Sequence, residues 1–200
     1  MTKIKLCGLT RISEVEAANE LSPEYVGFVF AKGSRRAVSA ETAAALKKML
    51  HADIRAVGVF VDENPETVIR LLDDGIIDIV QLHGSEGEDD IRRLRSYTEK
   101  PLIKAFCVDS RKDIELALAC SADYVLLDSG GGTGTVFDWR LVQSMKRPYF
   151  LAGGLDAVCV RDAVARLHPY AVDVSSGIET AGMKDKNKMA AFVAAVRKEG

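Results

Sequence analysis

The chain of 200 residues repeats one pattern, in which a short apolar run is followed by a segment typical of a helix. About eight such units follow one another with no linker or low-complexity tract between them. Regular alternation of this kind predicts a parallel sheet with crossover helices. The first expected strand ends at Cys7, and the later ones span residues 25–30, 54–61, 78–84, 101–106, 123–128, 149–152 and 170–174.

Two architectures can be built from such units: a closed barrel and an open, doubly wound sheet. The open sheet has a dinucleotide fingerprint after its first strand. The nearest glycine-rich segment, residues 130–135, lacks the final glycine and follows the sixth strand. Eight nearly equal units favour the (β/α)₈ TIM barrel, and we expect one domain over residues 1–200. After the last two strands we expect helices over Asp156–Arg166 and Asn187–Arg197, with a loop around Gly182 before the second.

Charge and apolar content argue against several classes of partner. The formal net charge of −2 gives no electrostatic reason to expect nucleic acid or an anionic membrane. No apolar run approaches the length of a membrane span, and no apolar segment of a signal peptide follows Met1. We expect a cytoplasmic protein, either a monomer or a homodimer. Its four cysteines form no C-x-x-C pair, so we expect free thiols. Its three histidines are scattered and form no H-E-x-x-H motif, so we expect no metal site.

Polar residues follow the apolar runs at the strand ends, where barrel enzymes carry their active sites. Each has an ordinary explanation alone: a lone cysteine is usually a small core residue, and a loop arginine is usually a solvated charge. Their joint position at one end of a barrel favours a functional interpretation. The residues are Cys7, Arg36, Gln81, His83, Asp128, Gly153, Gly154 and the segment Asp173–Gly177.

Glycine-rich segments follow the seventh and eighth strands, where barrel enzymes often bind phosphate through backbone N–H groups. Gly153-Gly154 would let the backbone approach an anion, and Ser175, Ser176 and Gly177 would add hydroxyl and amide donors. The segment Gly132-Thr133-Gly134 could close over the same group. Tight turns also need glycine, but the positions favour a sugar phosphate as the small-molecule ligand.

Cys7 and Asp128 end the first and sixth expected strands and could face each other across the barrel mouth. A thiolate and a carboxylic acid on either side of a sugar phosphate suit proton transfer, one taking a proton from carbon while the other gives one to oxygen. A cysteine is mostly protonated at neutral pH, so Cys7 would need positive charge or helix dipoles nearby to act as a base.

Together these segments resemble the phosphoribosylanthranilate isomerases of tryptophan biosynthesis over essentially the whole chain. Each motif alone is weak, and their order makes the resemblance specific. The matching segments are residues 5–10, 27–30, 34–36, 58–61, 80–84, 127–129, 131–134, 137–139, 151–155, 173–179 and 182–185.

The resemblance implies an Amadori rearrangement without metal or cofactor. It makes Asp128 the general acid that opens the ribose ring and Cys7 the general base that removes the C2′ proton. It implies that Arg36 binds the anthranilate carboxylate, for which a planar guanidinium is suited. Asp173 would contact the amino or hydroxyl groups of the substrate, and Gln81 and His83 would form part of the pocket wall.

Other phosphate-binding barrels are less compatible with these residues. The sugar isomerase of histidine biosynthesis performs the same chemistry but is expected to have an aspartate where this chain has Cys7, and it needs a second phosphate site. The indole-glycerol-phosphate synthase type relies on lysine and glutamate residues that are missing at these strand ends. A non-catalytic sugar-phosphate sensor would not require both Cys7 and Asp128.

Overall fold

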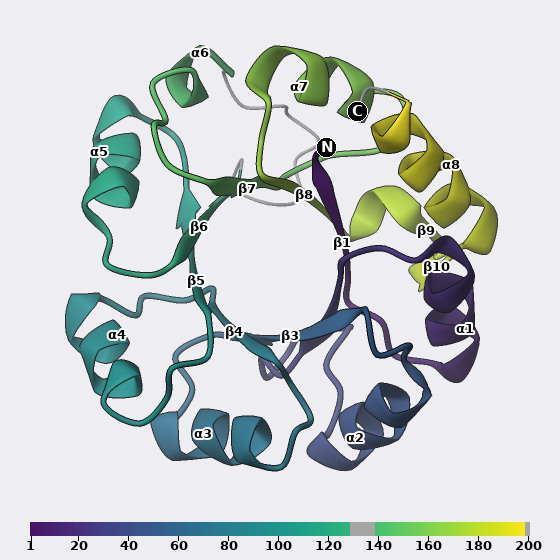
Figure 1. Ribbon diagram of the computed structural model, residues 1–200, viewed down its shortest axis with the longest axis horizontal. Helices are drawn as coiled ribbons and strands as arrows, with labels where there is room; N and C mark the ends of the chain where they lie inside the picture. Colours follow the sequence, from purple (N-terminus) through teal and green to yellow (C-terminus); the bar gives the residue numbers. More distant parts are fainter. Residues whose placement is uncertain (129–138, 199–200) are drawn as a thin grey trace.

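The computed structural model describes residues 1–128 and 139–198, in which eight parallel strands close into a barrel (Figure 1). The expectation of a (β/α)₈ TIM barrel is therefore confirmed. The strands are β1 (Lys3–Cys7), β2 (Tyr25–Val29), β3 (Arg55–Phe60), β4 (Ile79–Leu82), β5 (Leu102–Cys107), β6 (Tyr124–Asp128), β7 (Tyr149–Leu151) and β8 (Ala171–Val174). Each pairs with its sequence neighbours, and β8 pairs with β1 to close the ring.

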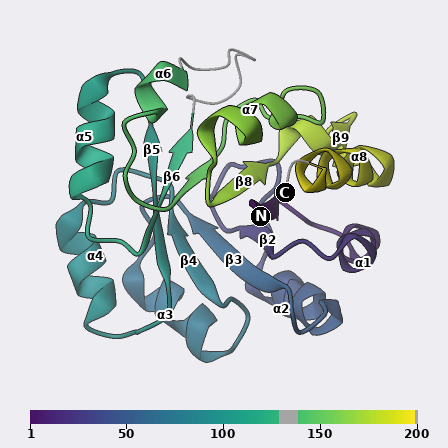
Figure 2. The same ribbon diagram turned by 45° about the horizontal axis from the view of Figure 1, so that its top comes forward.

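Helices surround this ring and cover its outer side (Figures 1 and 2). They are α1 (Ile12–Leu21), α2 (Ala40–Met49), α3 (Pro65–Asp73), α4 (Glu88–Arg95), α5 (Arg111–Ala119), α6 (Trp139–Val142), α7 (Val160–Leu167) and α8 (Lys186–Arg197). Local signals fix several helix starts: the Ser39 hydroxyl accepts from the Thr42 amide (3.1 Å), and Pro65 follows the capping residue Asn64. No helix of the described residues is long and apolar enough to cross a membrane.

Alternation along the strands divides the apolar side chains between two layers. One set packs between the strands and the helices and includes Ile4, Leu6, Phe28 and Val80. The other set fills the inside of the barrel. Its members are Tyr25, Val57, Ile79, Ile103, Ala105, Leu126, Phe150, Ala152 and Ala171. The inside of the barrel is thus a packed core of side chains and not an open pore.

Two local expectations differ from the structure. The helix expected from Asp156 begins at Val160, because the Asp156 carboxylate accepts from the amides of Val158 and Cys159 and holds a turn there. The loop expected around Gly182 is instead a hairpin of β9 (Glu179–Thr180) and β10 (Met183–Lys184). Its turn residues Ala181 and Gly182 have φ angles of 51° and 80°, as a two-residue hairpin turn requires.

Candidate active site

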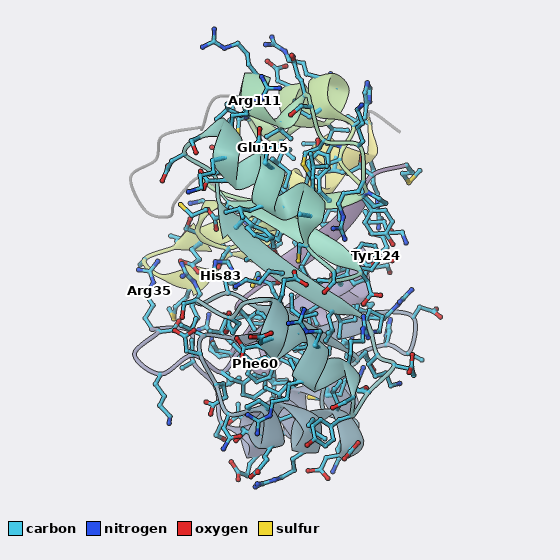
Figure 3. The ribbon with its side chains drawn as sticks, turned by 90° about the vertical axis from the view of Figure 1, so that its left-hand side faces the viewer. Arg35, Phe60, His83, Arg111, Glu115 and Tyr124 are labelled. Carbon is cyan, nitrogen blue, oxygen red and sulfur yellow. The ribbon has the colours of Figure 1, made fainter. Side chains whose placement is uncertain are left out.

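A cavity of about 630 Å³ opens where the strands end, and most of the predicted site residues line it. Its lining includes ten of them: Cys7, Arg36, Gln81, His83, Asp128, Gly153, Gly154, Asp173, Ser175 and Ser176. Gly177 follows directly in a short 3-10 helix, Ser176–Ile178. Gly132, Thr133 and Gly134 lie outside the described residues. In Figure 3, Arg35 and His83 lie toward this end of the barrel and Tyr124 lies toward the other.

Cys7 is the last residue of β1, and its side chain points into the mouth of the barrel. It is 8% exposed and packs with Val29 and Val59. Gly27 faces it on β2, and a β-carbon there would lie 2.6 Å from the Cys7 sulfur. Gly27 therefore leaves the space that the thiol occupies. Burial raises the pKa of Cys7, an effect that nearby Lys5 partly offsets.

Asp128 ends β6 and faces a hydrogen-bonded pair on the β4 side. The Gln81 amide nitrogen lies 2.9 Å from His83 Nδ1, and His83 Nε2 lies 3.7 Å from an Asp128 carboxylate oxygen. Burial lowers the pKa of His83, although the charge of Asp128 acts against this. A neutral His83 that accepts from Gln81 at Nδ1 presents its Nε2–H group to Asp128.

The two segments predicted to bind phosphate contact each other. Gly153 and Gly154 follow β7 with φ angles of 88° and 63°, which a side chain would disfavour. At Gly177 a β-carbon would collide with the Leu155 carbonyl oxygen, so the absence of a side chain lets the two loops approach. The glycines of these loops shape one wall of the cavity and expose backbone there.

Sequence and structure comparisons agree on the relatives of this chain. The sequence model described as N-(5′phosphoribosyl)anthranilate (PRA) isomerase matches residues 4–195. A protein of Endomicrobium trichonymphae named N-(5′-phosphoribosyl)anthranilate isomerase is 43% identical, over 98% of this chain and 99% of its own. This chain belongs to the N-(5′-phosphoribosyl)anthranilate isomerase family.

Solved structures of the family have the same fold. The phosphoribosyl anthranilate isomerase of Thermotoga maritima is 34% identical with a TM-score of 0.90, covering 99% of this chain and all of that one. A second family structure, 33% identical with a TM-score of 0.87 over 99% of this chain and all of its own, is a complex with reduced 1-(o-carboxyphenylamino)-1-deoxyribulose 5-phosphate.

Three charged residues of the site were not predicted from the sequence: Lys5, Glu179 and Lys184. Glu179 holds Arg36 through two hydrogen bonds, from Nε (2.6 Å) and from Nη2 (3.0 Å). Lys184 donates to Glu179 (2.7 Å) and to the Ser175 hydroxyl (3.1 Å). Burial by itself would raise the pKa of Glu179, but hydrogen bonds from Arg36 and Lys184 lower it to about 2. Glu179 is thus an anion that fixes Arg36.

Gly8 leaves space for the side chain of Arg36. Its φ angle is 81°, and a β-carbon there would lie 2.5 Å from Arg36 Cδ. The bidentate pair with Glu179 uses Nε and Nη2 of the guanidinium, while Arg36 also lines the cavity. Arg36 is therefore held from two sides at the cavity wall, and the third guanidinium nitrogen, Nη1, takes no part in that pair.

Proposed function

We propose that this protein isomerises N-(5′-phosphoribosyl)anthranilate to 1-(2-carboxyphenylamino)-1-deoxyribulose 5-phosphate, a step of tryptophan biosynthesis. Membership of the isomerase family along nearly the whole chain supports the reaction. The observation that carries the proposal is that Cys7 and Asp128 line one cavity at the carboxyl ends of the strands. The substrate is a small sugar phosphate, and the proposal invokes no cofactor, no metal, no nucleic acid and no membrane.

Asp128 and Cys7 each carry out one proton transfer in this reaction. Asp128, protonated, gives its proton to the ring oxygen of the ribose, and the ring opens to a Schiff base. Cys7, as the thiolate, takes the proton from C2′, and the electrons of that C–H bond form the double bond of an enolamine. The enolamine then tautomerises to the ketone: C1′ gains a proton and the C2′ hydroxyl loses one, while Cys7 releases the proton that it took and Asp128 regains the proton that it gave. The product is an isomer of the substrate, so no proton is consumed overall.

The remaining residues orient the substrate. Phosphate oxygens would accept from the backbone and hydroxyl groups of Gly153, Gly154, Ser175, Ser176 and Gly177, and the sequence predicts that Gly132, Thr133 and Gly134 bind the same group. Arg36, held by Glu179 through Nε and Nη2, would bind the anthranilate carboxylate through the edge that carries Nη1.

Asp173 and the β4 residues would complete the pocket. Asp173 would contact a hydroxyl or amino group of the sugar. Gln81 would hold His83 in the tautomer that donates toward Asp128. Whether the protein acts as a monomer or a homodimer, and whether it is cytoplasmic, stay predictions from the sequence.

The test is to mix the purified protein with freshly made N-(5′-phosphoribosyl)anthranilate and to follow the loss of its fluorescence. We expect rapid loss with the wild type and a loss slower by orders of magnitude with Asp128→Asn, which removes the acidic proton. A wild type that binds phosphate ligands but does not consume this substrate would contradict the proposal. The substrate of the histidine-pathway isomerase would then be tried next.

A further inference from the structure

Lys5 is a buried cation that the mechanism above does not use. It lies in the middle of β1 and is 0% exposed. Burying an ammonium group is strongly unfavourable unless the group is paired, so a lysine at this position needs a compensating interaction. Lysine side chains usually reach solvent, and this one points into the barrel instead.

Two groups surround the Lys5 ammonium. Its Nζ lies 3.0 Å from an Asp173 carboxylate oxygen, and the two residues are paired in register across β1 and β8. Cys7 is two residues further along β1, so its side chain lies on the same side of the strand, and the charge of the Lys5 ammonium acts on its thiol. Burial favours the neutral amine, but Asp173 and Cys7 outweigh burial and raise the pKa of Lys5. Lys5 is therefore a fixed positive charge.

Cys7 needs such a charge. Cys7 can act as a general base only as the thiolate, and burial in the barrel mouth raises the pKa of its thiol. Four charged groups act on it: Lys5 on β1, Asp173 on β8, Lys184 on β10 and Arg36 after β2. Lys5 lowers the pKa of the thiol more than Lys184 does, and Asp173 raises it.

We propose that Lys5 is a positioning residue that acts through Cys7: its ammonium group stabilises the thiolate that removes the C2′ proton. Asp173 holds Lys5 in place and at the same time limits its effect on the thiol. The thiol proton leaves to solvent before the reaction, the C2′ proton then forms the new S–H bond, and Lys5 keeps its protons throughout. The catalytic consequence rests on the proposed function, whereas the coupling between Lys5 and Cys7 is a property of the protein alone.

This arrangement predicts effects of opposite sign for two neighbouring substitutions. Lys5→Gln removes the cation and leaves Asp173 beside the thiol, so the pKa of Cys7 rises. Asp173→Asn removes the competing anion and makes the Cys7 thiolate the remaining counter-ion of Lys5, so the pKa of Cys7 falls. If the substitutions merely loosened the barrel mouth, the pKa of Cys7 would shift in the same direction in both variants, because the thiol would become hydrated in either case.

The experiment measures alkylation of Cys7 by iodoacetamide as a function of pH, with the modified peptide quantified by mass spectrometry. At neutral pH we expect the Cys7 rate to fall about tenfold in Lys5→Gln and to rise about tenfold in Asp173→Asn, the change in thiolate that accompanies one pKa unit. Exposed Cys107 in the same samples is the internal control, and its rate should stay constant. An unchanged Cys7 profile in Lys5→Gln, or shifts of the same sign in both variants, would overturn the proposal.

Folding of each variant is checked by thermal denaturation. If Lys5→Gln does not fold, Asp173→Asn decides alone, and a Cys7 rate that stays the same or falls would refute the role of Lys5. The assay contains no substrate, so its outcome is independent of the proposed reaction. If the wild type also turns over the substrate, the rise of kcat/KM with pH should move to higher pH in Lys5→Gln.

Discussion

The two ends of the barrel both carry clusters of polar side chains, and those at the carboxyl end line a cavity. At the carboxyl end, Cys7 and Asp173 line a cavity of about 630 Å³, and buried Lys5 pairs with Asp173. At the amino end, the hydroxyls of Tyr25 and Tyr124 lie 3.2 Å and 3.3 Å from that of Tyr170. Figure 3 shows how far Tyr124 lies from His83, across the length of the barrel.

The difference lies in how the polar groups are satisfied. The residues of the tyrosine cluster contact one another. The rings of Tyr124 and Tyr170 stack at 4.9 Å, both pack against Phe150, and Lys3 donates to the Tyr170 hydroxyl (2.7 Å). The carboxyl end instead holds buried charges beside empty space. In barrels the first arrangement serves stability and the second serves chemistry. Substitutions at the carboxyl end should therefore change activity, and substitutions at the amino end should change stability.

The largest effect on activity is expected for Cys7→Ala. Loss of the general base should lower kcat by a factor of about 10²–10⁴ while KM changes little, because a transition-state proton transfer is removed and ground-state binding is kept. The midpoint of thermal unfolding should stay close to that of the wild type. Steady-state kinetics and calorimetry measure both quantities, and turnover near that of the wild type would remove Cys7 from the mechanism.

Gly27→Ala should reduce activity through the same thiol. The added β-carbon would lie 2.6 Å from the Cys7 sulfur, so the thiol must move. A displacement of about 1 Å in a reacting group can cost about 10²-fold in rate. Gly87→Ala is the matched control, because an added β-carbon there meets no atom within 4 Å. Equal kcat values for the two variants would show that the placement of Cys7 tolerates this shift.

The sequence predicts the alternation of strands and helices and the residues at strand ends, because apolar periodicity and position after a strand are local signals. It does not predict the burial of Lys5, since lysine is usually exposed and its partner Asp173 is 168 residues away. Glu179 and Lys184 were missed for a related reason: β9 and β10 have two residues each, too few to show a strand period.

Arg36→Ala tests whether the held arginine binds the substrate carboxylate. We expect KM to rise about tenfold or more with a smaller change in kcat, since a charge-assisted hydrogen bond contributes about 1.5–3 kcal/mol. Glu179→Gln should raise KM by less, because it leaves the guanidinium in place but less firmly held. Arg35→Ala is the control, as this neighbour also pairs with Glu179 but is more exposed. An unchanged KM in Arg36→Ala would refute the carboxylate contact.

Tyr170→Phe should have the smallest effect, and it should fall on stability alone. The substitution removes a hydroxyl that accepts from Lys3 and bonds two tyrosines, so we expect the free energy of unfolding to fall by about 1 kcal/mol and kcat to stay unchanged. Denaturant unfolding and steady-state kinetics measure the two. A clear loss of kcat would show that the two ends of the barrel are coupled.

The same hydroxyl gives the amino end a pH dependence. Burial would raise the pKa of Tyr170, but hydrogen bonds from Lys3, Tyr124 and Tyr25 lower it to about 8, below its ordinary value of about 10. A group whose pKa is lower in the folded state contributes stability above its unfolded pKa, and this contribution is lost as the pH falls from about 10 to about 8.

Wild type should therefore show a phenolate absorbance change near pH 8 that Tyr170→Phe lacks, and the stability difference between the two proteins should grow from pH 8 to pH 10. If both proteins titrate alike near pH 8, the lysine at this end does not stabilise a phenolate, and the cluster contributes through packing and neutral hydrogen bonds only.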